Sequence, residues 1–146
     1  MRIIRTVAPA FRARQAARFL VEFGGASVSS AERVKAVGNI LKEYQGVKLL
    51  VVISAMGKTT NALEKVVEAF FAGDKNKALD LFNVIKNDHL AIAKELATDH
   101  FTQGEHGPDL NDFFTEIEWL LHDRPVKSYD YYYDQVVCVG ELLSTA

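Results

Sequence analysis

The sequence predicts an α/β fold built around a parallel sheet, and three observations support this prediction. Residues 19–23 (FLVEF) form a short run rich in β-forming residues, which stops at two glycines before an amphipathic segment. Residues 48–53 (KLLVVI) form a continuous apolar run, typical of a strand buried on both faces. This run leads into residues 54–61 (SAMGKTTN) and a second amphipathic segment. Two strands that each end in a turn and a helix make a parallel βαβ unit, so we expect both turns at one sheet edge, where ligands bind.

The turn after the first strand is a candidate anion site. Gly24 and Gly25 allow the backbone to approach a ligand closely, and the first N–H groups of a following helix lack intrahelical partners. A purely structural turn is the alternative. Residues 57–59 (GKT) suggest a P-loop, but that motif requires a glycine where this chain has Val52. We therefore do not expect a P-loop.

The composition is that of one globular domain. The chain has 146 residues, of which 49% are hydrophobic and 25% are charged. Its net charge of −2 gives no reason to expect binding to nucleic acid or to an anionic membrane. No apolar run approaches the roughly 18 residues of a membrane span. The single cysteine, Cys138, excludes an internal disulfide; we expect it to be a small core residue, and we expect a cytoplasmic location.

The first residues differ in composition from the rest. No acidic residue precedes Glu22, whereas five arginines do: Arg2, Arg5, Arg12, Arg14 and Arg18. We expect residues 1–17 to be an ill-ordered extension without function and residues 18–146 to be the folded domain. An organellar transit peptide is the alternative for the extension.

Hydrophobic periodicity predicts three helices in the first two thirds of the domain. Residues 31–44 form the first, with Ser30 as its N-cap and Gly46 after its end. Residues 60–71 form the second, which Gly73 closes, and residues 74–96 form the third.

The last third of the chain is also predicted to be helical. After Pro108 and Asp109 we expect a helix with an inward stripe, and Trp119 covering its edge; the stripe is Phe113, Ile117, Leu120 and Leu121. The tyrosines within residues 129–133 are expected to be half-buried at a helix end, before an amphipathic stretch over residues 136–143. The histidines His89, His100 and His106 lack metal-ligand spacing, so we predict no metal site.

Two features suggest that these residues form part of a larger domain. The last amphipathic stretch reaches Ala146 without a capping residue, and two parallel strands make a poor sheet, because a parallel sheet needs cover on both faces. We therefore expect a truncated domain whose exposed apolar surface leads to homodimers or aggregates.

Three motifs, taken together, resemble the N-terminal part of the catalytic domain of an aspartate kinase, a member of the amino-acid kinase family. They are residues 23–28 (FGGASV), 54–61 (SAMGKTTN) and 140–145 (GELLST). The resemblance covers residues 19–146, and three motifs in the right order are more specific than any one of them. It implies a carbamate kinase-like three-layer fold with a parallel sheet, in which the adenine-binding half follows this part.

The resemblance also implies an activity: ATP-dependent phosphorylation of the side-chain carboxylate of L-aspartate, the entry step to lysine, methionine and threonine synthesis. ATP and Mg²⁺ would be the cofactors. A carboxylate with a pKa of about 3.9 is already ionised at neutral pH, so no general base is needed. Catalysis then consists of aligning two anions and neutralising the charge on the transferring group.

The resemblance assigns the phosphates of ATP to Gly24, Gly25 and Ser27. The family has a lysine before this Phe-Gly-Gly, whereas this chain has Glu22. Two like charges at 4 Å repel by about 1 kcal/mol in water and by about 4 kcal/mol at an effective dielectric constant of 20. We therefore expect Glu22 to disable phosphoryl transfer, and the chain to be a very poor kinase.

The resemblance assigns the aspartate to Ser54 and Thr60, which would donate hydrogen bonds, and to Glu141, which would pair with the α-ammonium group. The structural alternatives are turn and N-cap roles for Ser54 and Thr60, and a solvated helix position for Glu141. Three functions stay open: an inactive aspartate kinase homologue, a non-catalytic aspartate-binding module, and another amino-acid kinase that acts on glutamate, carbamate or a nucleoside monophosphate.

Overall fold

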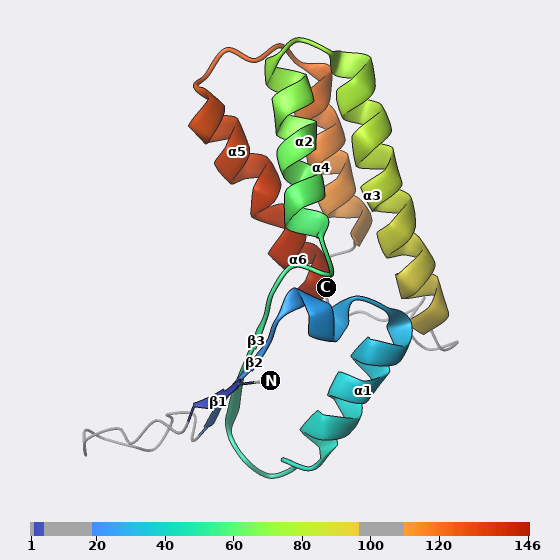
Figure 1. Ribbon diagram of the computed structural model, residues 1–146, viewed down its shortest axis with the longest axis vertical. Helices are drawn as coiled ribbons and strands as arrows, with labels where there is room; N and C mark the ends of the chain where they lie inside the picture. The colour runs from blue at the N-terminus through green and yellow to red at the C-terminus, as the bar shows by residue number, and fades with distance from the viewer. Residues whose placement is uncertain (1, 5–18, 97–109) are drawn as a thin grey trace, which may run out of the picture.

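The computed structural model describes residues 2–4, 19–96 and 110–146. The elements, in chain order, are β1 (Arg2–Ile4), β2 (Phe19–Phe23), the 3₁₀ helix η1 (Gly25–Val28), α1 (Ala31–Lys42), β3 (Leu49–Ile53), α2 (Thr59–Phe71), α3 (Lys75–Leu96), α4 (Leu110–His122), α5 (Tyr129–Val137) and α6 (Val139–Thr145). In Figure 1 the sheet and α1 occupy the lower part of the molecule, and the helices α2 to α5 form a bundle above them. The short helix α6 lies where the two parts meet.

The sheet confirms the predicted α/β class. Strands β2 and β3 are parallel, with a register that runs from Phe19 opposite Leu49 to Phe23 opposite Ile53. Strand β1 pairs with β2 in the antiparallel direction, with Arg2 opposite Glu22. Sequence analysis did not predict β1, because it assigned residues 1–17 to an ill-ordered extension; residues 5–17 of that extension lie outside the described residues.

One face of the sheet is buried and the other is open. Val21 and Phe23 are each 1% exposed and form a small core with Val28 and with Val37 of α1. The prediction that β3 is buried on both faces is wrong, because Leu50 is 51% exposed and Val52 is 41% exposed. Alternate side chains of a strand point to opposite faces, and in the part of the chain described here α1 covers one face only. The expected fold has a sheet between two layers of helices. The described residues form the sheet and the helical layer on one side of it.

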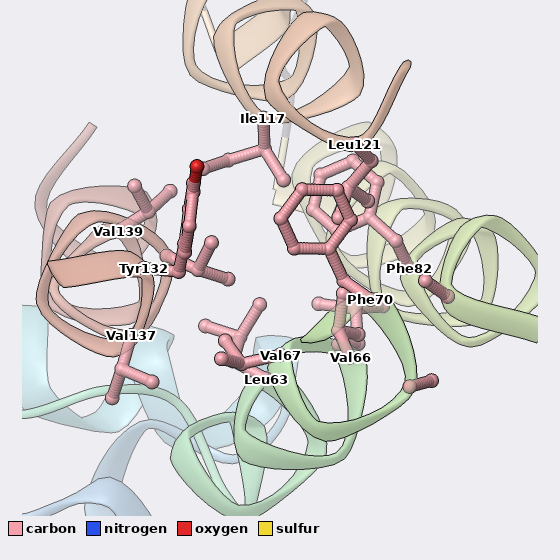
Figure 2. Packing of buried hydrophobic residues seen from close by; sticks show 14 of the residues in the cluster. Leu63, Val66, Val67, Phe70, Phe82, Ile117, Leu121, Tyr132, Val137 and Val139 are labelled. Atoms are coloured by element: carbon pink, nitrogen blue, oxygen red, sulfur yellow. The ribbon is translucent and has the colours of Figure 1, made fainter. Parts of the chain in front are cut away.

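The larger core lies among the helices (Figure 2). Side chains from one face of α2 point toward the other helices of the bundle; the labelled ones are Leu63, Val66, Val67 and Phe70. They meet Phe82 of α3, Ile117 of α4 and Tyr132 of α5. The rings of Phe70 and Tyr132 pack edge to face, with 5.1 Å between their centroids. Helix α2 is therefore central to the bundle, and this position holds its N-terminus in place beside the sheet.

The predicted helix boundaries are close to those observed. The Ser30 hydroxyl accepts a hydrogen bond from the Arg33 backbone N–H at 3.4 Å, so Ser30 is the N-cap of α1, as predicted. Gly46 and Gly73 both have positive φ, at 80° and 83°, which favours glycine at these turns after α1 and α2. Helix α2 begins at Thr59, one residue before the predicted start.

Replacing Ser30 with alanine is expected to reduce the free energy of unfolding by about 1 kcal/mol, because the cap bond is lost. The substitution also removes the hydroxyl that donates to the Glu32 carboxylate at 2.8 Å and lowers the pKa of Glu32. Urea denaturation followed by circular dichroism measures the change. Ser30→Thr keeps an oxygen that can cap the helix and is the control. An equal loss of stability in both variants would contradict the capping role.

Three predictions about the last third of the chain need correction. Phe114, which the predicted stripe omits, is fully buried on α4, whereas Phe113 is only half-buried against the same core. Trp119 is 75% exposed and covers no edge of the core. Cys138 is exposed and is not a core residue. The pKa of its thiol is raised, by partial desolvation first and by the nearby charge of Glu141 second, so that it is a poor nucleophile.

The tyrosine cluster is mixed in burial. Tyr129 and Tyr133 are half-buried as predicted, whereas Tyr131 is exposed and Tyr132 is buried. The Tyr132 hydroxyl accepts hydrogen bonds from the backbone N–H groups of Val126, at 2.8 Å, and Lys127, at 3.2 Å. The Tyr133 hydroxyl donates to Glu64 of α2 at 2.8 Å. The bond to Glu64 holds α5 against α2. The bonds to Tyr132 fix the turn before α5.

Candidate functional site

The turns after β2 and β3 contact each other directly. The Gly57 N–H donates to the Gly25 carbonyl oxygen at 2.9 Å, and the Ser54 N–H donates to the Phe23 carbonyl oxygen at 3.0 Å. The strands are parallel, so their carboxyl ends lie at the same edge of the sheet. The prediction that the two turns share one edge is confirmed.

Gly25 lies so close to the second turn that no side chain fits there. A Cβ atom at Gly25 would overlap the carbonyl oxygen of Ala55 and would lie 3.0 Å from that of Gly57. Gly24 differs, since a Cβ atom there would meet no atom within 4 Å, and its φ of −69° suits any residue. Gly25 is therefore required for the contact between the turns, whereas Gly24 leaves an exposed stretch of backbone beside them.

Ala55 is the point at which all three sequence motifs meet. Its backbone contacts Gly25 of the first motif, and it is itself in the second. Gly140 of the third motif is buried, and a Cβ atom there would lie 3.1 Å from the Ala55 Cβ and 3.3 Å from the Leu63 Cδ1. Helix α6 therefore lies against the second turn through its glycine. Segments more than 80 residues apart in the chain thus form one site.

The Ser54 and Thr60 hydroxyls have no hydrogen-bond partner among the described residues, although both side chains are half-buried. Other hydroxyls nearby are used internally: Thr59 donates to the Met56 carbonyl oxygen at 2.6 Å, and Ser144 donates to that of Gly140 at 3.0 Å. Helix α2 also has no side-chain N-cap. The Ser54 and Thr60 hydroxyls therefore do not cap a helix or close a turn, and both can donate to a ligand. Thr59 looks equally suitable in the sequence, but only the fold shows that its hydroxyl is already bonded.

Gly24, Gly25 and Ser27 form the other side of the site. The Ser27 N–H donates to the Gly24 carbonyl oxygen at 2.7 Å, which closes the turn into η1. Gly24 is exposed, and Gly25 and Ser27 are half-buried. Open backbone of this kind can approach a phosphate group without steric hindrance.

Glu22 lies on the open face of the sheet, one residue before the buried Phe23. Its register partners are Val52 on β3 and Arg2 on β1. The carboxylate is half-buried, so its negative charge is only partly screened beside the first turn. The open backbone at Gly24 leaves room for a phosphate group, whereas the negative charge of Glu22 would repel one.

Glu141 lies in the first turn of α6 and is exposed. Because Gly140 lies against Ala55, the adjacent Glu141 is held near the second turn, although it forms no side-chain hydrogen bond with Ser54 or Thr60. Among residues 2–4, 19–96 and 110–146, no group of three or more His, Cys, Asp or Glu side chains could hold a metal ion. His100 and His106 lie outside the described residues.

Comparisons with known proteins agree with this arrangement. Residues 17–146 match the family model of the amino acid kinase family. The chain is 34% identical over 128 residues to the chloroplastic aspartokinase 2 of Arabidopsis thaliana, which covers 86% of this chain and 23% of that protein. It is 32% identical over 134 residues to the chloroplastic aspartokinase 3 of the same plant, with coverage of 86% and 22%.

Solved structures give the same result. The fold superposes on E. coli aspartokinase III in complex with aspartate and ADP with a TM-score of 0.67 and 25% identity, over 86% of this chain and 26% of that one. The TM-score is 0.68 for the complex of the same enzyme with lysine and aspartate. The chain spans about a quarter of the length of these proteins. None of its described helices is both long enough and apolar enough to cross a membrane.

Proposed function

The chain belongs to the amino acid kinase family, and from this premise we propose that its three motifs form the aspartate-binding part of an aspartate kinase site. The observation that carries the proposal is the convergence of the motifs on Ala55. Ser54 precedes Ala55 and Thr60 lies in the first turn of the following α2, and neither hydroxyl has a hydrogen-bond partner among the described residues. The whole reaction would transfer the γ-phosphoryl group of ATP to the side-chain carboxylate of aspartate.

In this proposal Ser54 and Thr60 donate hydrogen bonds to the aspartate. Glu141 is exposed at the start of α6, and its carboxylate pairs with the α-ammonium group. A hydroxyl that already bonds within the fold would have to lose that bond on ligand binding, whereas free hydroxyls do not. The Ser54 and Thr60 hydroxyls are therefore suited to hold the substrate in one orientation, which is the main requirement when no proton has to be removed.

The exposed backbone at Gly24 and Gly25, together with Ser27, is proposed to lie against the phosphates of ATP. Mg²⁺, when bound with the nucleotide, would neutralise part of the charge on the transferring group. Glu22 places a negative charge beside the same turn. We therefore propose weak nucleotide binding and poor transfer, and the carboxylate of Glu22 at this position favours a second candidate function: an aspartate-binding module without kinase activity.

Calorimetric titration of the 146-residue chain with L-aspartate and, separately, with Mg-ATP tests both functions. Glu22→Lys is expected to tighten Mg-ATP binding by at least about tenfold, since it replaces repulsion with attraction near the phosphates. Aspartate binding should not change. Glu116→Lys makes the same charge change at an exposed position on α4 and is the matched control.

The outcomes separate the two proposals. Aspartate binding in the native chain, together with Mg-ATP binding that improves only in Glu22→Lys, supports a kinase site weakened at one residue. Aspartate binding with no nucleotide binding in any variant supports the binding module. If Ser54→Ala and Thr60→Val bind aspartate as tightly as the native chain, the proposed substrate site is wrong.

A further inference from the structure

Arg33, in the first turn of α1, reaches back to the turn after β2. Its guanidinium group donates a hydrogen bond from Nη1 to the Ala26 carbonyl oxygen at 3.1 Å. Ala26 lies in η1, between Gly25 and Ser27, which are the residues proposed to lie against phosphate groups. The fold therefore brings a positive charge to this turn, from a residue that sequence analysis did not assign to the site.

The shape of the turn does not depend on Arg33 alone. The Ser29 hydroxyl donates to the same Ala26 carbonyl oxygen, also at 3.1 Å. The N–H of the same peptide unit belongs to Ser27, and it donates to the Gly24 carbonyl oxygen at 2.7 Å. Both ends of this peptide unit are therefore bonded within the fold, and Arg33 adds a positive charge to a turn that other bonds already hold.

Most of the hydrogen-bonding capacity of the Arg33 guanidinium group is unused. The group has five N–H donors in one plane. Among the described residues its side chain has the one bond to Ala26, and no carboxylate forms an ion pair with it. The neighbouring Glu32 carboxylate instead accepts from the Ser30 hydroxyl at 2.8 Å. Arg33 is exposed, so a planar pair of donors can bind two oxygens of one phosphate group while the bond to Ala26 is kept.

The stability of α1 does not explain a cation at this position. The helix dipole repels a positive charge in the first turn and attracts one in the last turn, where Lys42 lies. Lys35, two residues after Arg33, has a carboxylate partner, because its Nζ is 3.6 Å from Glu95 of α3. Arg33 has no such partner among the described residues. An anion bound at the turn after β2 would offset the repulsion.

We propose that Arg33 binds the phosphates of the nucleotide and supplies at this turn the positive charge that Glu22 does not. The inference rests on the proposed nucleotide role of residues 24–27. Arg33 keeps its bond to the Ala26 carbonyl oxygen and donates its other N–H groups to phosphate oxygens. Because the bond to Ala26 already restricts the guanidinium group, less conformational entropy is lost when the phosphate binds.

The test is a titration of the full 146-residue chain with inorganic pyrophosphate, followed by NMR at the Arg33 Nε–H and the Ser27 backbone N–H. Both signals are expected to shift saturably, with one dissociation constant. Arg33→Gln should weaken binding by about tenfold, the usual scale for a charge-assisted hydrogen bond. Arg33→Lys keeps the charge and loses the planar donors, so its affinity should lie between those of Arg33→Gln and the native chain.

Two further variants separate phosphate binding from other effects of Arg33. Lys35→Gln removes a positive charge from the same helix, and it should change binding by less than about twofold at an ionic strength of about 0.15 M, where exposed charges are screened beyond about 8 Å. Ser29→Ala removes the other bond to the Ala26 carbonyl oxygen and keeps the charge, so it should weaken binding less than Arg33→Gln. Equal weakening in these last two variants would mean that Arg33 only holds the turn, and would overturn the proposal.

The proposal is also overturned if pyrophosphate produces no saturable shift in the native chain, or if Arg33→Gln binds it as tightly as Lys35→Gln. Urea denaturation shows whether each variant is folded, and the shift of the Arg33 Nε–H in the native chain decides the question if Arg33→Gln is not. A parallel titration with L-aspartate separates this inference from the proposed substrate site. Aspartate binding without pyrophosphate binding overturns the role of Arg33 alone, whereas Arg33-dependent pyrophosphate binding without aspartate binding supports that role and overturns the substrate site.

Discussion

Replacing Gly25 with alanine is expected to destabilise the protein by about 2–3 kcal/mol and to abolish aspartate binding. The added methyl group would overlap the Ala55 carbonyl oxygen, which belongs to backbone and cannot rotate away. The two turns must then separate, and the hydrogen bond from the Gly57 N–H to the Gly25 carbonyl oxygen is strained or lost. Because Ala55 also contacts Gly140, we expect the effect to reach α6 and Glu141.

Gly24→Ala is the matched control, because it makes the same chemical change at the adjacent residue, where the space is open. Its free energy of unfolding should stay within about 0.5 kcal/mol of the native value. Urea denaturation measures the stability of both variants, and calorimetric titration measures aspartate binding. Equal stability of the Gly25 and Gly24 variants would show that the turns do not approach each other as described.

Phe114→Ala is expected to cost about 3–5 kcal/mol, the largest single effect on stability that we predict. Phe114 is fully buried, and its ring packs edge to face with Phe82 of α3 at 6.2 Å between centroids. The Lys86 ammonium group lies 5.8 Å from the centre of the same ring, and the His89 ring packs against it at 6.4 Å. Removing this ring leaves a cavity between α3 and α4 that neighbouring side chains cannot fill.

Trp119→Ala is the comparison for Phe114→Ala, since it removes an even larger side chain from the same helix. Trp119 is 75% exposed, so its loss should change the free energy of unfolding by no more than about 0.5 kcal/mol. Thermal and urea unfolding of the two variants provide the measurement. A large loss for Trp119→Ala, or a small one for Phe114→Ala, would mean that the two faces of α4 are assigned the wrong way round.

Sequence patterns predicted most of the elements, because the signals that define them are local. A serine before an amphipathic run predicted the cap at Ser30, and glycines after such runs predicted the turns at Gly46 and Gly73. The parallel pairing of residues 19–23 and 48–53 followed from two strand-turn-helix units in succession. In each case the signal for a cap, a turn or a strand-turn-helix unit lies within a few positions of the chain, although the two paired strands are farther apart.

The errors occurred where burial depends on a distant part of the chain. Phe113 and Phe114 are adjacent aromatic residues that both pack against the core, and the position of α3 decides that Phe114 is the fully buried one. The run at residues 48–53 is apolar throughout, yet Leu50 and Val52 are exposed, because α1 covers only the opposite face. Periodicity indicates that a helix or strand has an apolar side and does not indicate what lies against it.

The sequence by itself determined the fold class, the order of the helices and the three motifs that identify the family, because motif residues and their spacing are visible in one dimension. Only the tertiary structure decided that Gly25 and Gly140 meet at Ala55, and that the Ser54 and Thr60 hydroxyls are free while that of Thr59 is bonded. It also showed that the buried Nε2 of His89 has no hydrogen-bond partner among the described residues. The physical reason is that hydrogen bonding and steric exclusion act between atoms a few ångströms apart, and the residues that carry those atoms are far apart in the chain.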